Sequence, residues 1–292
     1  MKNNFILVLI SLSIALNANG HYEKDKNLFI VGSTSVAKLI DVTAVPFYEK
    51  TGIQLIMRPL GSDKGVVSIA ENVSDIGVIS RFLTKEERQR HPELRQKTIA
   101  QDAIIFIVNI ENPITNLNAS QIANMYTSDT PIWPGSGKPA NLYSKKIGHG
   151  THDSFLSYLN LESMYSVENS QMNFKKIGIN NLYSNNNIQG YNKINQAVGL
   201  VFRDKSSLAF ESLGAYQHFI EGQEFVKTKY VSFNGINPIS AGKKNLEYPF
   251  KRPFNIIFNT NISDMATEYK KFLASTEAQQ LLRDNYYIPV MK

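Results

Sequence analysis

The 292-residue sequence contains no cysteine, no polybasic tract and no long apolar run after its first twenty residues. The absence of cysteine excludes disulfide bonds, thiol catalysis, cysteine-ligated metals and a lipid anchor on an N-terminal cysteine. Without a polybasic tract, nucleic acid is not an expected partner. Without a second long apolar segment, the chain is expected to be soluble once its first segment has been removed.

Residues 1–20 have the pattern of a secretory signal peptide. Lys2 is followed by an apolar stretch from Phe5 to Leu16 and by the small-residue exit Ala18-Asn19-Gly20. The apolar stretch is too short to span a bilayer comfortably. Lys2 is the only charged residue in this segment, so its removal lowers the formal net charge from +6 to +5. We expect an exported, periplasmic protein that is not a lipoprotein and that can accommodate an anionic small molecule.

Three glycine turns provide the main functional signal. The apolar run Leu28 to Val31 ends in Gly32-Ser33-Thr34-Ser35, after which apolar residues recur at helical spacing. Similar turns occur at Gly61-Ser62 and at Gly148-His149-Gly150-Thr151. Glycine can adopt backbone conformations that other residues avoid, and the free amides of a helix N-terminus favour an anion. The sequence thus predicts several amide-lined turns that accept one anion.

A cationic side chain accompanies two of the predicted strands. Ser74 to Ile79 is a buried strand that ends in Ser80-Arg81, where the planar guanidinium can bind an oxyanion through two hydrogen bonds. Lys145 lies in a short strand expected from Tyr143 to Ile147. His149 and His152 are three residues apart, but no third histidine lies nearby, so we expect no metal site.

The order of elements predicts an α/β protein. A strand, a glycine turn and a helix follow one another twice within the first 70 residues, which is typical of parallel sheets. The apolar segment Ile99 to Asn109 is interpreted as a central strand that crosses into a second domain. Residues Phe210 to Phe225 look irregular. Residues Met265 to Leu282 form one predicted amphipathic helix.

The order of these motifs resembles the phosphate-binding periplasmic proteins of Pst-type ABC importers. The motifs that carry the resemblance are Gly32-Ser33-Thr34-Ser35, Gly61-Ser62-Asp63-Lys64-Gly65, Asp75-Ile76-Gly77 with Ser80-Arg81, Ala100 to Asn109 with Asn112-Pro113, Tyr248-Pro249 with Arg252-Pro253, and the ending Phe272 to Pro289. The resemblance implies a type II periplasmic-binding-protein fold: two α/β lobes with mostly parallel sheets, joined by a two-segment hinge. Lobe I would comprise residues 27–108 and 236–292, and lobe II residues 109–235.

The resemblance also implies a set of ligand-binding residues in the cleft. These are Ser33, Thr34, Ser62, Ser80, Arg81, His149, Gly150 and Thr151, with Lys145, Asp63 and Asp153 as additional candidates. The sequence departs from the family pattern at two positions, where Lys145 replaces arginine and His149 replaces serine. A receptor selective for hydrogen phosphate needs an acceptor for its proton. Asp63, Asp153 and neutral His149 all remain candidates.

By this resemblance the protein is a receptor that captures inorganic phosphate and delivers it to an inner-membrane ABC permease. We expect a monomer without a cofactor or enzymatic activity. One alternative is a signalling or adhesion protein of the same fold that binds phosphate weakly, and another is a receptor for sulfate or molybdate. Under the weak-binding alternative, restoring serine at His149 and arginine at Lys145 raises phosphate affinity. A secreted phosphatase is disfavoured because no activated nucleophile is recognisable.

Overall fold

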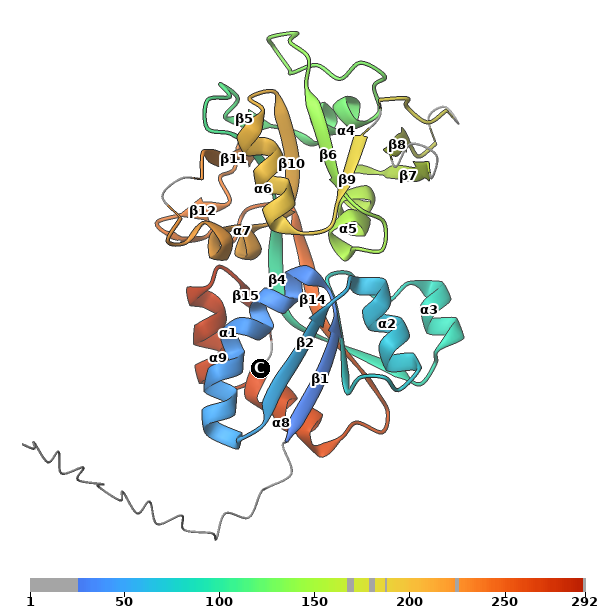
Figure 1. Ribbon diagram of the computed structural model, residues 1–292, viewed down its shortest axis with the longest axis vertical. Helices are drawn as coiled ribbons and strands as arrows, with labels where there is room; N and C mark the ends of the chain where they lie inside the picture. Colours follow the sequence, from blue (N-terminus) through green and yellow to red (C-terminus); the bar gives the residue numbers. More distant parts are fainter. Residues whose placement is uncertain (1–25, 167–170, 179–181, 187, 224–225, 291–292) are drawn as a thin grey trace, which may run out of the picture.

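The computed structural model describes residues 26–166, 171–178, 182–186, 188–223 and 226–290. The signal peptide expected at residues 1–20 lies outside this range. Two lobes stand one above the other, with β4 and β14 running between them (Figure 1). Within the described ranges, the helices are too short or too polar to cross a membrane.

Lobe I, the lower lobe in Figure 1, has a sheet in the order β2-β1-β3-β14-β4, and β15 also pairs with β4. Strand β1 is parallel to β2 and β3, and β14 is antiparallel to both β3 and β4. The elements of the lobe are β1 (Asn27–Gly32), α1 (Thr34–Thr51), β2 (Gln54–Pro59), α2 (Ser62–Ala70), β3 (Ile76–Ile79), α3 (Lys85–Arg90), the first part of β4 (Leu94–Asn109), β14 (Lys251–Asn259), α8 (Asp264–Leu273), α9 (Thr276–Asp284) and β15 (Ile288–Pro289).

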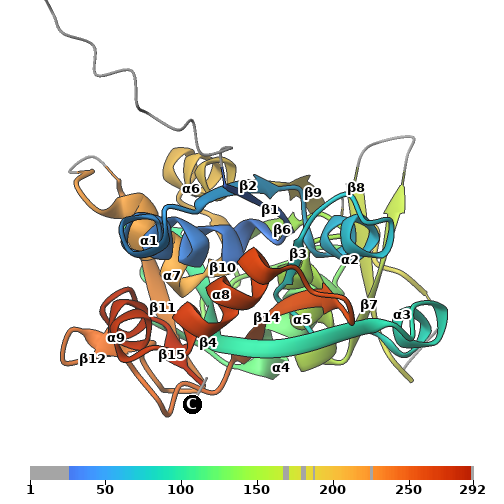
Figure 2. The same cartoon turned by 90° about the horizontal axis from the view of Figure 1, so that it is seen from below.

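Side chains that alternate along the strands cover both faces of this sheet. Ile76 and Val78 of β3 belong to a core shared with α1, α8 and α9, whereas Ile79 points to the opposite face, where α2 packs. Figure 2 shows α2 on one side of the lobe and α1 with α9 on the other. The two helices that begin at the glycine turns, α1 and α2, therefore lie on opposite faces of one sheet.

Lobe II continues the same sheet beyond β4, in the order β4-β10-β6-β9-β8-β7. Strand β6 is parallel to β10 and β9. The elements of this lobe are β5 (Asn116–Leu117), α4 (Ala119–Tyr126), β6 (Asn141–Lys145), α5 (Gly150–Leu159), β7 (Leu161–Ser166), β8 (Gln171–Lys176), β9 (Ile188–Tyr191), α6 (Ile194–Arg203), β10 (Ser207–Ser212), α7 (Leu213–Ile220) and β11 (Thr228–Phe233). Strands β12 (Ile239–Ser240) and β13 (Lys243–Lys244) form a separate two-stranded sheet. Its core is rich in aromatic residues, including Phe155 stacked on Phe210 at 4.0 Å between ring centroids.

The hydrophobic cores change from one lobe to the other within the two crossing strands. On β4, Ala100 belongs to the core of lobe I and Ala103 to that of lobe II. On the returning chain, Phe250 packs in lobe II and Phe254 in lobe I. The lobe limits expected near residues 108 and 236 remain predictions.

Two element predictions were wrong in detail. Residues 210–220, expected to be irregular, form the end of the buried strand β10 and helix α7, which begins where Ser212 accepts a hydrogen bond from the Ala215 amide. The predicted helix over Met265 to Leu282 is two helices, because the Ser275 hydroxyl caps the start of α9. The strand Ile99 to Asn109 is confirmed and begins earlier, at Leu94.

Candidate functional site

Four turns from the two lobes bring buried hydroxyl groups together. Strands β1 and β3 lie side by side and parallel, so Ser33 and Ser80 emerge at the same edge of the sheet, and Ser62 follows β2 there. Helix α5 of lobe II adds Thr151 from across the cleft. We call this group the hydroxyl cluster: Ser33, Ser35, Ser62, Ser80 and Thr151. All five residues are buried.

Hydrogen bonds within the hydroxyl cluster connect the lobes. Ser62 Oγ accepts hydrogen bonds from the amides of Ser80 and Gly150, both at 3.2 Å. Ser35 Oγ lies 3.2 Å from Thr151 Oγ1. Gly150 is required here, because a Cβ atom on it would stand 2.5 Å from Ser62 Oγ and 2.6 Å from Ser80 Oγ.

Arg252 supplies the positive charge at the hydroxyl cluster. Its Nη1 donates to Thr151 Oγ1 at 2.6 Å and to Ser80 Oγ at 3.3 Å. Its Nε and Nη2 both donate to Asp102 Oδ2, at 3.1 and 3.0 Å. Arg252 and Asp102 face each other in the antiparallel register of β14 and β4, and both are buried. Asp102 thus orients the guanidinium so that one side of it faces the hydroxyls.

Sequence reasoning did not identify Arg252 as a ligand-binding residue, although it noted the Arg252-Pro253 dipeptide. A signal was present: Arg252 directly precedes the mostly apolar stretch Pro253 to Phe258, and Asp102 directly precedes the apolar run Ala103 to Val108 of the crossing strand. Charged residues in such positions are rarely buried unless they are paired. Recognising the pair required the register of β14 against β4.

The structure places Arg81 apart from the hydroxyl cluster, against three carboxylates. Nε donates to Asp153 at 2.9 Å, Nη2 to Asp63 and Glu87 at 2.7 Å each, and Nη1 to Glu87 and to the carbonyl of Phe82 at 2.7 and 2.9 Å. These contacts use all five N–H groups of the guanidinium. Arg81 therefore has no donor left for an anion in this arrangement.

The carboxylates around Arg81 include two of the additional candidates from the sequence. Burial raises the pKa of Asp153 to about 6, opposed by the charge of Arg81 and reinforced by that of Asp63. Hydrogen bonds from Arg81 contribute to lowering the pKa of Glu87, although burial acts in the opposite direction. Since Arg81 lies on lobe I and Asp153 on α5, their ion pair also connects the lobes.

His149 is buried in a neutral form directly before α5. Burial and then the charge of Lys145 lower its pKa to about 4. Its Nε2 lies 3.3 Å from Oδ1 of Asn192. Because an amide oxygen only accepts hydrogen bonds, this contact fits the tautomer with the proton on Nε2 and the lone pair on Nδ1. Nδ1 is buried and has no hydrogen-bond partner among the described residues. It lies 3.7 Å from the position that a Cβ atom on Gly61 would occupy.

Lys145 and Thr34 border the hydroxyl cluster on its other side. The ammonium group of Lys145 is buried and forms an ion pair with Glu211. Burial lowers the pKa of Lys145, and Glu211 opposes that shift. Thr34 and Lys145 both line a cavity that adjoins the cluster through Ser35. The structure therefore brings Ser33, Ser62, Ser80, Gly150 and Thr151 together, with Thr34, His149 and Lys145 around them.

The fold and this site define a two-lobed binding protein with donor groups converging between its lobes. The PBP superfamily domain matches residues 17–277. The chain belongs to the PBP superfamily.

Among curated proteins, the chain is 23% identical to the phosphate-binding protein PstS of Borreliella burgdorferi, over 99% of both chains. It is 31% identical to PstS 2 of Streptococcus pneumoniae over 107 residues, or 36% of each chain. Among solved structures, it resembles a putative phosphate ABC transporter substrate-binding protein with bound phosphate from Clostridium perfringens. That match has a TM-score of 0.72 and 24% identity, covering 90% of this chain and 99% of the other. An ABC-type phosphate transport receptor from Vibrio cholerae matches with a TM-score of 0.66 and 24% identity, covering 90% and 100%.

Proposed function

We propose that this protein is a receptor that binds inorganic phosphate between its lobes and delivers it to an ABC permease. The observation that carries the proposal is the convergence of the hydroxyl cluster, the Gly150 amide and the Arg252 guanidinium at one buried point. Hydroxyls, amides and a guanidinium are the groups that bind a phosphate oxygen. The names of the relatives support phosphate as the ligand. The role is binding and transfer rather than catalysis.

We further propose that His149 accepts the proton of hydrogen phosphate. Asp63 and Asp153, the other two candidates, both accept hydrogen bonds from Arg81. Nδ1 of His149 has a lone pair and no partner among the described residues. Fully ionised sulfate has no proton to donate, and its oxygen would meet that lone pair. A neutral imidazole can thus distinguish the two anions.

Calorimetry on the purified protein tests the ligand. We expect heat of binding with phosphate at micromolar concentration and much weaker binding of sulfate and molybdate. Strong heat with sulfate or molybdate and none with phosphate would overturn the proposal. Because phosphate contaminates many preparations, the protein should be unfolded, dialysed and refolded before titration.

A weak-binding signalling or adhesion protein is the second candidate, favoured by one observation. The ammonium group of Lys145 is engaged with Glu211 instead of being available to an anion. This candidate predicts that the double variant Lys145→Arg, His149→Ser binds phosphate much more tightly than the natural protein. Tight binding by the natural protein would exclude it.

We also propose that residues 1–20 direct export and that the mature chain, without a lipid anchor, acts as a monomer in the periplasm. Mass spectrometry of the protein from a periplasmic extract should give a chain that begins near His21. Light scattering should give the mass of one chain. A retained N-terminal segment would contradict the export signal, and a lipid modification would contradict the absence of an anchor. The mass of a dimer would contradict the monomeric state.

A further inference from the structure

The proposed role of His149 requires one of the two neutral forms of its imidazole ring. A neutral imidazole carries its proton on Nδ1 or on Nε2, and the other nitrogen has the lone pair. The hydrogen bonds of the ring decide which form is present. With the proton on Nδ1, this buried atom would be a donor without a partner among the described residues, and the cleft would lose its candidate acceptor.

Asn192 contacts the other nitrogen of the His149 ring. Its Oδ1, which can only accept a hydrogen bond, lies 3.3 Å from Nε2. The backbone of Asn192 is fixed on both sides. Its amide donates to Oε1 of Gln196 at 2.9 Å, and the carbonyl of the preceding Tyr191 accepts from the Lys146 amide at 3.0 Å. Because Lys146 and His149 belong to the same turn, Asn192 is held directly against the segment that carries the imidazole.

Burial keeps the ring of His149 uncharged. Burial and the charges of Lys145 and Lys146 lower its pKa to about 4, although the charge of Asp63 acts in the opposite direction. The nearby ring of His152 is neutral as well, since burial lowers its pKa to about 3. Near neutral pH, the imidazole of His149 therefore carries a single proton, and its hydrogen bond determines where that proton lies.

We propose that Asn192 is a positioning residue that holds the proton of His149 on Nε2 and so keeps the lone pair of Nδ1 free for the proton of hydrogen phosphate. This inference rests on the proposed function, because it requires that His149 contacts the bound anion. Asn192 is exposed and acts through the imidazole ring, without a contact of its own to the ligand.

Nitrogen-15 NMR of the ring measures the tautomer directly, because a nitrogen with a proton and one with a lone pair differ in chemical shift. His149→Gln assigns the signals among the five histidines of the sequence. We expect the form with the proton on Nε2 in the natural protein, and a mixture of both forms in Asn192→Leu, which lacks the acceptor. A proton on Nδ1 in the natural protein, or an unchanged tautomer in Asn192→Leu, would overturn the inference.

Asn192→Asp tests the consequence for anion selectivity. A carboxylate beside Nε2 favours the imidazolium form of His149, in which Nδ1 donates a hydrogen bond instead of accepting one. Between about pH 8 and about pH 5.5, the sulfate affinity of this variant should therefore rise at least about tenfold relative to the natural protein. Sulfate stays fully ionised over this range, so the change reports on the protein.

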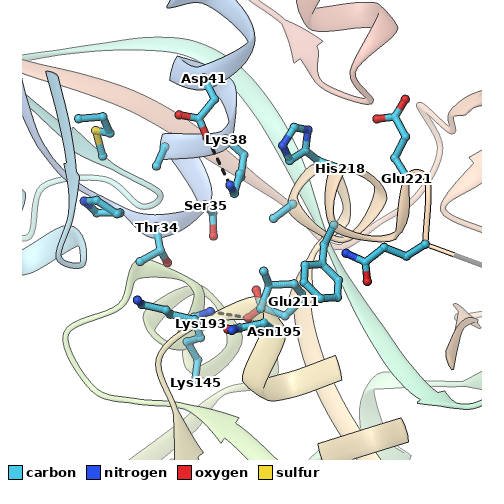
Figure 3. A pocket seen from close by; sticks show the side chains of 17 residues that line it. Thr34, Ser35, Lys38, Asp41, Lys145, Lys193, Asn195, Glu211, His218 and Glu221 are labelled. Carbon is cyan, nitrogen blue, oxygen red and sulfur yellow. Dashed lines mark hydrogen bonds and ion pairs between the residues drawn. The ribbon is translucent and has the colours of Figure 1, made fainter. Parts of the chain in front are cut away.

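Asn195→Asp is the matched control. Asn195 is also exposed, and it lines the cavity of about 530 Å³ that adjoins the hydroxyl cluster, where Figure 3 shows it on the same side as Lys193. Its Oδ1 accepts a hydrogen bond from the Gln196 amide at 3.0 Å, which a carboxylate can retain. The control adds the same charge near the cleft without the contact to His149. Its sulfate affinity should stay within about threefold of the natural protein at every pH.

The outcomes separate this inference from the proposed function. Tight phosphate binding by the natural protein, with the same sulfate response in Asn192→Asp and Asn195→Asp, would overturn the inference and leave the phosphate receptor intact. Failure of phosphate to bind the natural protein would refute the proposed function itself, whatever tautomer the NMR spectra show. Thermal melting of each variant checks that the fold is retained.

Discussion

Arg81 and Arg252 both connect the lobes, but they are surrounded by different groups. Arg81 contacts three carboxylates, contributed by α2, α3 and α5. Arg252 contacts one carboxylate, Asp102, and directs its Nη1 to the hydroxyls of Ser80 and Thr151. Arg81 with its three carboxylates has a formal charge of −2, whereas Arg252 with Asp102 has a formal charge of zero.

This difference shows why an arginine near a cleft need not bind an anion. A guanidinium that already has a surplus of carboxylates presents a negative surface, and Coulomb repulsion opposes a second anion there. A guanidinium held by one carboxylate is oriented and keeps an edge that can donate to neutral acceptors and to an incoming ligand. Arg81 is therefore suited to holding the two lobes together through ion pairs, and Arg252 is suited to binding the ligand.

The largest effect expected from this comparison is that of Arg252→Lys on phosphate affinity. Lysine keeps the charge but loses the planar fork that spans Asp102 and the hydroxyl cluster. Loss of a buried, charge-assisted contact typically costs about 2–5 kcal/mol, so we expect phosphate binding to weaken at least about 30-fold. Calorimetry measures the loss, and denaturant unfolding shows whether the variant is folded. Affinity within threefold of the natural protein would refute the assignment of Arg252.

Sequence reasoning located the hydroxyls better than the charges. Ser33, Ser62, Ser80 and Thr151 each follow a strand or open a helix at a small-residue turn, a local pattern that parallel strands bring to one edge. Arg252 depends on the pairing of strands 150 positions apart, which local pattern does not encode. Arg81 was expected to face the ligand because it follows the end of a strand and matches the family motif. The carboxylates that enclose it come from three separate helices, so the local pattern did not reveal them.

The limits of local sequence pattern also explain why residues that line the cavity were not identified from the sequence. Glu211 and Ala215 fall in the segment expected to be irregular, where β10 and α7 actually form. A carboxylate inside a buried strand obscures the alternation of apolar and polar residues, and only its partner Lys145 explains why it is there. The α/β class, in contrast, was predictable from the alternation of strands, glycine turns and helices, and the two-lobed arrangement from the resemblance to the Pst-type phosphate-binding proteins.

The next largest effect concerns His149. His149→Leu removes the lone pair of Nδ1 while retaining much of the volume. A hydrogen bond contributes about 0.5–1.5 kcal/mol, so phosphate affinity should fall up to about tenfold while sulfate affinity stays the same or rises. His149→Gln, which still offers an acceptor oxygen, is the control. An equal change for both anions in His149→Leu would contradict the proton-acceptor role.

Arg81→Lys should separate stability from binding. Lysine has three donors instead of five, so at least two of the charge-assisted hydrogen bonds of Arg81 are lost. We expect the free energy of unfolding to fall by about 1–3 kcal/mol while phosphate affinity changes less than threefold. Chemical denaturation and calorimetry on the same preparation measure both quantities. A loss of affinity as large as that of Arg252→Lys would make Arg81 a ligand-binding residue after all.

The smallest effect should come from Asp63→Asn, because the side chain of Asp63 is 50% exposed and water screens its pair with Arg81. We expect a loss of stability below about 1 kcal/mol.

The Asp63→Asn variant should also lower the pKa of Asp153 from about 6, since the charge of Asp63 is one cause of its elevation. A raised folded-state pKa means that Asp153 favours the native state below its unfolded value of 3.8, and that this contribution is lost as the pH rises through 6. Carbon-13 NMR titration of the Asp153 carboxyl measures the pKa directly, and an unchanged or higher value in Asp63→Asn would mean that the three carboxylates do not act as one charged group around Arg81.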